Sequence, residues 1–278
     1  MKQNPFSFYD ILGYLIPGLF LISNFFLIEA WKVSCDGATI LSLLNSMPTF
    51  KFENVIIIFI FAYSIGHLLS FTSSITVEKY SIWKYGYTSK FLLNMSVPKF
   101  IDHFKTIYGA FWGITIIIII LPTFILDTIL GKYLGFKTFY SKTLDKQLIK
   151  LILFKVNKLA TLLGMTEKNN FEMGKGHEGD FFRIIFHYTY ENSKNHQSKF
   201  INYVALYGFL RTMTLIANIL TWYLAIHFEI LKQFDSISLI LIIASSLISY
   251  MFFMSFMKFY RRYTLEAFMV LASDKELI

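Results

Sequence analysis

The sequence predicts an all-α integral membrane protein with four or five transmembrane helices and a small helical cytoplasmic insertion. Of its 278 residues, 55% are apolar and 16% are Asp, Glu, Lys or Arg, whereas about 25% are charged in an ordinary soluble domain. The mean hydropathy is +0.52. The apolar residues fall into blocks of about 20 residues or more, the length of a helix that crosses a bilayer. These observations argue against a disordered chain, a coiled coil and a soluble enzyme.

The apolar blocks divide the chain into three regions. Residues 1–131 form a first membrane region, residues 132–199 form a basic helical insertion, and residues 200–278 form a membrane helix pair with a tail. No small-residue cleavage site follows the first block, so we expect it to remain as a helix. The blocks lie at about residues 6–31, 54–76, 107–131, 203–227 and 237–257.

Basic residues between the blocks predict the orientation of the helices. Residues 76–106 carry five lysines against two acidic residues, and residues 132–199 carry twelve basic against six acidic residues. Residues 31–53 and 228–235 carry no basic excess. Because Lys and Arg stay on the cytoplasmic side, we expect both basic segments and both termini on the cytoplasmic side of a bacterial inner membrane. Cys35 is then expected in the periplasm.

This orientation creates a conflict at the block 107–131. A single crossing cannot join two segments that both lie in the cytoplasm. Pro122 interrupts the helical hydrogen bonds of this block, and a break at membrane depth needs protein or water to cover it. We therefore favour a re-entrant or broken hairpin, with one full crossing as the alternative.

The block at 54–76 carries two stripes of related residues. Polar residues at membrane depth are expected to face protein or water, and small residues let two helix backbones approach closely. We favour helix packing, with His67 hydrogen-bonded to a neighbour, over a pore or polar cavity. The small residues are Ala62, Gly66, Ser70 and Ser74, and the polar stripe is Tyr63, His67, Ser70 and Ser74.

Gly109 and Gly113 form a Gly-xxx-Gly motif at the start of the third block. The motif predicts close packing within the chain or, as a sharper alternative, an interface between subunits.

Asp127 and Arg211 are the two charges that lie nearest to membrane depth. We favour Arg211 at the cytoplasmic edge of its helix, with its guanidinium reaching water. If it is buried instead, it needs a carboxylate, and Asp127 or Asp10 is the expected partner.

The insertion begins with a basic amphipathic helix. Its lysines are expected to contact anionic headgroups, and the alternatives are packing on the rest of the insertion or binding of an anionic ligand or nucleic acid. Five lysines form this surface: Lys142, Lys146, Lys150, Lys155 and Lys158.

Motifs for catalysis are missing from the sequence. The Gly-Lys-Gly run at 174–176 lacks the spacing of a phosphate-binding loop, and the six histidines lack zinc-ligand spacing. We therefore expect no enzyme activity, no cofactor and no metal.

Three segments resemble a class of poorly characterised bacterial multi-pass membrane proteins: FYDILGYLIPG at 8–18, SIGHLLS at 64–70 and ALYGFLR at 205–211. Proteins of this build often act as membrane effectors of anti-phage systems, where a cytoplasmic signal controls a membrane-disrupting oligomer. The resemblance implies a homo-oligomeric effector or channel, in contact with membrane lipids and controlled through residues 132–199 by a regulatory protein, a nucleotide or an oligonucleotide. The alternatives are a non-catalytic anchor that recruits a cytoplasmic partner and an integral-membrane enzyme or transporter.

Overall fold

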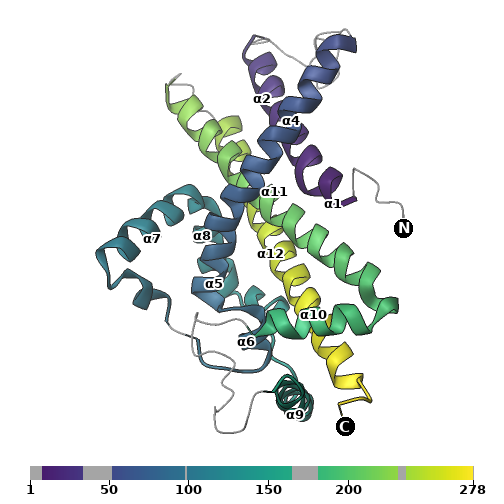
Figure 1. Ribbon diagram of the computed structural model, residues 1–278. Coiled ribbons are helices and arrows are strands. Elements are labelled where there is room, and N and C mark those ends of the chain that lie inside the picture. Colours follow the sequence, from purple (N-terminus) through teal and green to yellow (C-terminus); the bar gives the residue numbers. More distant parts are fainter. Residues whose placement is uncertain (1–7, 34–51, 98, 165–180, 231–235, 278) are drawn as a thin grey trace.

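The predicted class, an all-α integral membrane protein, is confirmed. The computed structural model describes residues 8–33, 52–97, 99–164, 181–230 and 236–277. Every regular element in these ranges is a helix (Figure 1). Four of them are long and apolar enough to cross a membrane: Ile11–Ile28, Val55–Leu92, Lys194–His227 and Ser238–Ser273. The bent pair Ile107–Ile119 and Leu121–Tyr133 would make a fifth if it is one span.

Two long helices form the centre of the fold. They are α11 (Gln197–Ile230) and α12 (Ser236–Ser273), with 34 and 38 residues. At 1.5 Å per residue they are about 51 and 57 Å long, so both extend beyond an apolar layer of about 30 Å. In the 18-residue apolar stretch of the span that contains α11, 72% of the residues are buried inside the protein, against 17–22% in the corresponding stretches of the other three spans. The other spans therefore present most of their apolar side chains outward.

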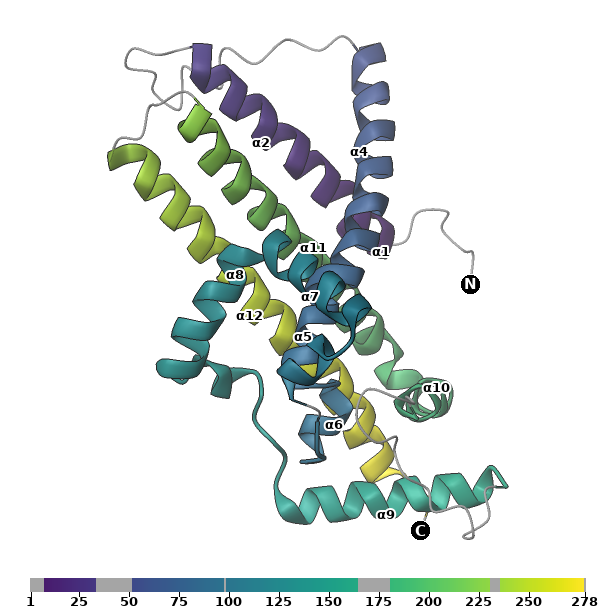
Figure 2. The same ribbon diagram turned by 90° about the vertical axis from the view of Figure 1, so that its left-hand side faces the viewer.

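The first two helices pack along α11, where Arg211 contacts Ser70 and Tyr223 packs edge-on against Phe25 (Figure 2). The second helix is longer than expected, because it continues past Thr76 with a π-helical stretch rather than ending there. The elements are α1 (Phe8–Asp10), η1 (Ile11–Leu15), α2 (Ile16–Val33), α4 (Phe52–Ser73), η2 (Ser74–Glu78), α5 (Lys79–Tyr85) and α6 (Thr88–Leu92).

The third block is broken at Pro122. Here α7 (Ile107–Ile119) meets α8 (Leu121–Leu126) and η4 (Asp127–Tyr133) at 91°, and α7 stands out from the bundle (Figure 1). Before α7, the 3₁₀ turn η3 (Phe100–Phe104) stacks His103 on Trp83 of α5. After α8, Asp127 also contacts α5. Both ends of the block therefore lie against the same helix.

The basic insertion packs on the last turns of α12. Its elements are η5 (Phe136–Phe139), α9 (Lys146–Leu162), α10 (Phe182–Asn192) and η6 (Lys194–His196). Helix α9 buries Ile152, Val156 and Leu159 and lies across one end of the molecule beside the C terminus (Figure 2). On α10, Phe182 packs edge-on against Phe268 of α12.

Candidate functional site

Asp127 lies at the centre of a buried polar cluster and is 0% exposed. Its Oδ2 atom accepts from Lys84 Nζ at 2.7 Å and from the Tyr80 hydroxyl at 2.8 Å. Its Oδ1 atom accepts from the hydroxyls of Tyr140 at 2.7 Å and Tyr85 at 2.8 Å. We call these five residues the Asp127 cage. A buried carboxylate is costly unless it is paired and hydrogen-bonded, and this one receives both kinds of partner.

The cage joins three parts of the chain. Tyr80 and Lys84 are four residues apart on α5, so they share one helix face. Burial and the charge of Asp127 raise the pKa of Tyr140, so its phenol stays a neutral donor. Gly131, one turn after Asp127, leaves room for the cluster, since a Cβ atom there would lie 2.7 Å from Asp127 Oδ1.

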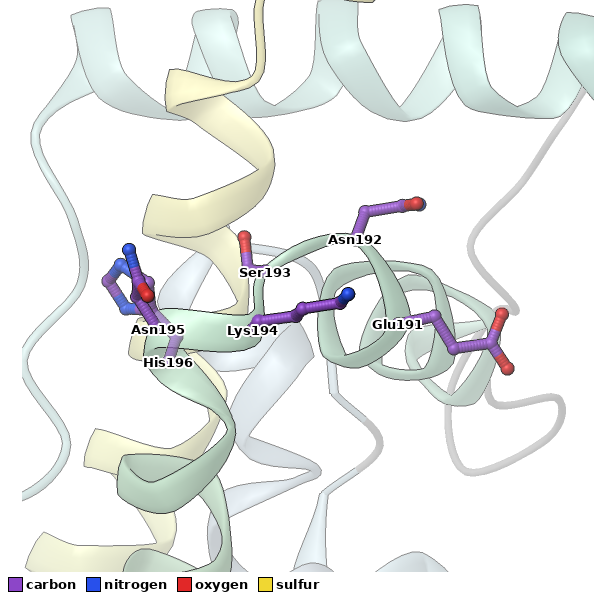
Figure 3. A pocket seen from close by; sticks show the side chains of 6 residues that line it. All are labelled: Glu191, Asn192, Ser193, Lys194, Asn195 and His196. Atoms are coloured by element: carbon purple, nitrogen blue, oxygen red, sulfur yellow. The ribbon is translucent and has the colours of Figure 1, made fainter.

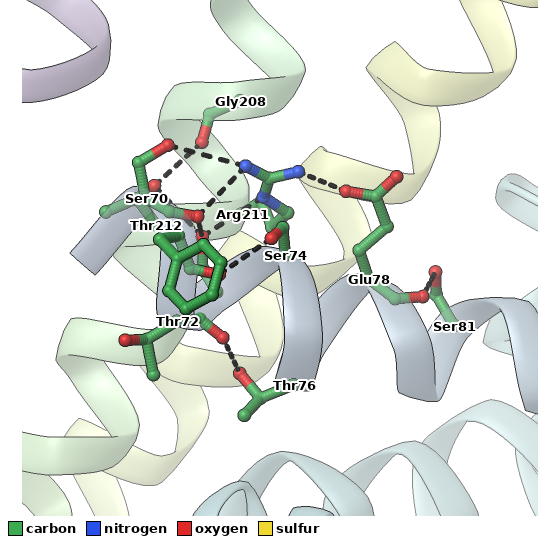
Figure 4. Close-up of polar contacts among 11 residues, drawn as sticks. Ser70, Thr72, Ser74, Thr76, Glu78, Ser81, Gly208, Arg211 and Thr212 are labelled. Atoms are coloured by element: carbon green, nitrogen blue, oxygen red, sulfur yellow. Dashed lines mark hydrogen bonds and ion pairs between the residues drawn. The ribbon is translucent and has the colours of Figure 1, made fainter. Parts of the chain in front are cut away.

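Arg211 lies in a second buried polar cluster and is 8% exposed. Its guanidinium pairs with Glu78, and Nε donates to Ser73 Oγ at 3.1 Å. Nη2 donates to the backbone oxygen of Ser70 at 3.2 Å. Figure 4 shows the guanidinium between Ser70 and Glu78.

The predictions for Arg211, a guanidinium in water or a pair with Asp127 or Asp10, were wrong. Asp127 binds Lys84 instead, and the Arg211 guanidinium is buried rather than held in water. The sequence interpretation ended the second helix at Thr76. In the structure, η2 continues this helix and brings Glu78 to Arg211.

The break at Pro122 is stabilised by side chains of α11. Proline has no N–H, so the Ile118 carbonyl four residues earlier loses its helical donor. Trp222 Nε1 donates to this oxygen at 2.9 Å. On the other side of the break, Thr123 N donates to Asn218 Oδ1 at 3.2 Å. Two residues one turn apart on α11 thus satisfy both freed backbone groups.

A polar contact also holds α8 to α12. The hydroxyls of Thr123 and Ser249 are 3.0 Å apart, and Asn218 Nδ2 donates to the Thr123 hydroxyl at 2.8 Å. The sequence analysis missed Asn218, although a carboxamide within an apolar block is itself a signal of a buried contact.

The small-residue stripe of α4 packs on the first helix. A Cβ atom on Gly66 would lie 1.9 Å from the Tyr14 backbone oxygen. A Cβ atom on Gly18 would lie 1.8 Å from the backbone oxygen of Ala62, which is fully buried. These contacts lie within one chain and support the helix-packing interpretation.

The polar stripe of α4 is divided between two neighbours. His67 is exposed and stacks on Tyr14, with ring centroids 3.7 Å apart, and Tyr63 packs edge-on against His67. Ser70 contacts Arg211, and the Ser74 hydroxyl donates to the backbone of its own helix. The stripe therefore contributes to two separate contacts rather than to one polar cavity.

Gly109 and Gly113 pack against η3, immediately before their own helix. A Cβ atom would lie 2.1 Å from the His103 oxygen at Gly109 and 2.5 Å from the Phe104 ring at Gly113. The motif therefore serves close packing within the chain.

The five lysines of the insertion do not share one surface. Helix α9 begins only at Lys146, because Asp145 caps it by accepting from Gln147 N at 3.1 Å. Lys142 precedes the helix, and its carbonyl accepts from Arg261. Lys155 is buried and donates to the Asp274 backbone oxygen at 2.6 Å. The remaining three, Lys146, Lys150 and Lys158, are exposed.

Asp274 accepts hydrogen bonds from both α9 and α10 of the insertion. Besides the bond from Lys155 of α9, its Oδ2 atom accepts from the Tyr188 hydroxyl of α10 at 2.8 Å. Burial and this hydrogen bond raise the pKa of Tyr188 to about 12. We call Lys155, Tyr188 and Asp274 the Asp274 junction. The predicted lysine surface missed it because Lys155 lies on the buried face of α9.

A shallow pocket lies at the corner between α10 and α11 (Figure 3). His196 lines it, and its Nδ1 atom lies 2.6 Å from Glu266 Oε1 of α12. The other lining residues are Glu191, Asn192, Ser193, Lys194 and Asn195. Among the described residues, no three His, Cys, Asp or Glu side chains converge as metal ligands. Cys35 and the Gly-Lys-Gly run lie outside the described residues.

The fold and these buried clusters define an α-helical membrane protein with a broken apolar helix pair and an insertion attached to its last helix. Comparisons with protein-family models, with curated proteins and with solved structures give no match.

Proposed function

We propose that this protein is a non-enzymatic, homo-oligomeric membrane effector or channel-like protein, controlled through residues 132–199. The observation that carries this proposal is the Asp274 junction. It attaches α9 and α10 of the insertion directly to the end of α12.

Helix α12 links the insertion to the broken helix pair. Asp274 follows the last residue of this helix, and Ser249, which contacts Thr123 of α8, lies 25 residues earlier. A helix of that length is about 37 Å long. A ligand or regulatory protein that shifts the insertion would therefore act on α8 through one continuous helix.

The broken pair is the part that we expect to respond. Ile107 is 88% exposed and Phe111 is 71% exposed on α7, so this apolar helix faces lipid or a second subunit. The Asp127 cage holds the other end of the pair to α5. Release of the cage would free the pair to rearrange in the membrane.

The orientation is part of the same proposal. We place the termini and the insertion in the cytoplasm of a bacterial inner membrane, as the basic excess of residues 76–106 and 132–199 favours. Since both ends of the third block contact α5, we favour a re-entrant hairpin over a crossing. A role in anti-phage defence rests on the segment resemblances alone.

Membrane depolarisation on overexpression tests the proposal. We expect wild-type protein to depolarise cells that carry a voltage-sensitive dye. Lys155→Met with Tyr188→Phe removes two donors of the junction and should change the depolarisation at equal membrane abundance. The exposed Lys158→Met change on the same helix is the control and should behave as wild type. A wild-type protein that leaves the potential intact would contradict the effector proposal.

A membrane anchor is the second candidate. Leu151, Phe154 and Leu162 are exposed on the outer face of α9, where they would suit a cytoplasmic protein partner. An anchor predicts no depolarisation. It also predicts loss of a co-purifying partner when Phe154 is changed to Ser.

A further inference from the structure

The segment 132–139, which comprises the end of η4 and the turn η5 and is called the loop 132–139 below, presents lysines and apolar side chains outward together. Lys132 and Lys137 are exposed. Tyr133 is 75% exposed, Leu134 is 62% exposed and Phe139 is 74% exposed. Lysine beside exposed aromatic residues is typical of segments that lie at a membrane–water interface.

This loop is held in place at both ends. Asp127 of the cage precedes it, Gly131 packs closely against Asp127, and Tyr140, which follows it, is fully buried against Asp127. Within the loop, Gly135 takes a left-handed conformation with φ of 76°, which glycine adopts without strain. The Thr138 hydroxyl donates to the Gly135 oxygen at 2.8 Å. The outward side chains are therefore presented by an ordered turn.

The position of the loop fits the headgroup layer. Ile125 and Ile129, on the turns of α8 and η4 before it, are exposed as lipid-facing residues would be. The cage residues Tyr80 and Tyr85 lie four and nine residues beyond Thr76, which ends the second apolar block. At 1.5 Å per residue this is about 6–14 Å past the apolar layer, at or just beyond the headgroups, which add about 5–8 Å on each side.

The loop also carries positive charge, and neither of its lysines forms an ion pair within the part of the chain that the structure describes. Residues 128–144 contain no Asp or Glu. Lys132 and Lys137 both lie close enough to Lys84 to repel it. Asp127 already pairs with Lys84, so it does not neutralise the two loop lysines as well.

We propose that the loop 132–139 binds the headgroup of an anionic phospholipid. Lys132 and Lys137 pair with the phosphate, while Tyr133, Leu134 and Phe139 enter the boundary between headgroups and acyl chains. This site is separate from α9, which lies across one end of the molecule beside the C terminus (Figure 2). It goes beyond the proposed effector function, because it requires only that the protein lies in a membrane.

Lipid retention tests whether the two loop lysines bind an anionic headgroup. Purified protein in neutral detergent is mixed with equal amounts of phosphatidylglycerol and phosphatidylcholine, and bound lipids are counted by native mass spectrometry. We expect preferential retention of phosphatidylglycerol, weakened by salt. Lys132→Gln with Lys137→Gln should reduce this preference by roughly fivefold per lysine, whereas Lys150→Gln with Lys158→Gln on α9 should not. Preference that survives in the loop variant, or that fails only in the α9 variant, would overturn the proposal.

Fluorescence tests how deeply the loop lies in the bilayer, and this test does not depend on the lysine variants. Phe139→Trp is placed in vesicles of three parts phosphatidylcholine to one part phosphatidylglycerol and compared with the parent protein. We expect the added fluorescence to be quenched by lipids brominated near the headgroup and shielded from iodide. Phe154→Trp on α9 is the matched control, with the reverse pattern. Quenching of the loop tryptophan by iodide alone would show that the loop lies outside the membrane and would refute the site.

Discussion

The indole N–H of Trp222 donates to the backbone oxygen of Ile118, the group that Pro122 leaves without a helical donor. A free carbonyl at membrane depth costs free energy, because no water is present to replace the missing donor. Together with Asn218, this side chain of α11 makes a 91° break between α7 and α8 tolerable.

Trp222→Phe should destabilise the protein by about 1–2 kcal/mol, since it leaves the Ile118 oxygen without its donor but keeps most of the ring. Unfolding in detergent, followed by circular dichroism, measures the change. Trp112→Phe, at an exposed position of α7, is the control and should have little effect. Pro122→Ala restores the N–H, so Trp222→Phe should cost less in that background. Equal costs in both backgrounds would contradict the assigned role.

Asp127→Asn should destabilise the protein by about 3 kcal/mol, because it leaves Lys84 without its buried counter-ion. Adding Lys84→Met to the Asp127→Asn variant should recover part of this loss, as the unpaired charge is then removed. Asp102→Asn is the matched control. Its pair with Lys105 is exposed, so the change should be within about 1 kcal/mol. Additive effects at Asp127 and Lys84 would show that the two residues do not act as a pair.

Gly66→Ala should destabilise the protein by about 2 kcal/mol or more and broaden its elution in detergent. The added Cβ atom would overlap the Tyr14 backbone oxygen, which cannot move without shifting the first helix. Gly208→Ala is the control, because its Cβ atom would meet Tyr9 at an ordinary 3.8 Å. Should both variants melt alike, the close approach of α4 and η1 is not required.

The Asp274 junction should weaken in alkaline solution. The pKa of Tyr188 is raised from an ordinary 10 to about 12, so the folded state holds the phenol proton more tightly than the unfolded state. The contribution of the protonated Tyr188 phenol to the stability of the folded state is complete below pH 10. It is lost as the pH rises from 10 to 12. Amide exchange in α10 should therefore accelerate over this range in the wild type. In Tyr188→Phe, exchange should be faster already at pH 8 and lack this additional step. Identical pH profiles would refute the assignment.

Cysteine labelling tests the side of the membrane on which each end of the third block lies. In a Cys35→Ser background, Lys105→Cys and Lys146→Cys place exposed thiols before and after the block. A re-entrant hairpin predicts that an impermeant maleimide reaches both only after spheroplasts are opened. A full crossing predicts opposite results for the two positions. Cys35 in the unmodified protein should react from outside, and its complete protection in reduced protein would overturn the proposed orientation.

The sequence by itself determined the class of the protein, because apolar blocks of membrane-spanning length are a local property of the chain. It also located the helix break, since the missing N–H of Pro122 acts within its own helix. The close packing of a neighbouring helix at Gly66 was also predictable from the sequence, because a glycine has no side chain to keep another backbone away.

Only the tertiary structure decided which polar groups meet. Arg211 pairs with Glu78, and Asp127 with Lys84, because a continuous α4, η2 and α5 carries both partners past the end of the apolar block. Likewise, Lys155 contacts the end of α12 instead of an open basic surface. A buried charge selects its partner by distance in three dimensions. Residue spacing predicts such distances within one helix but not between helices that are joined by long loops.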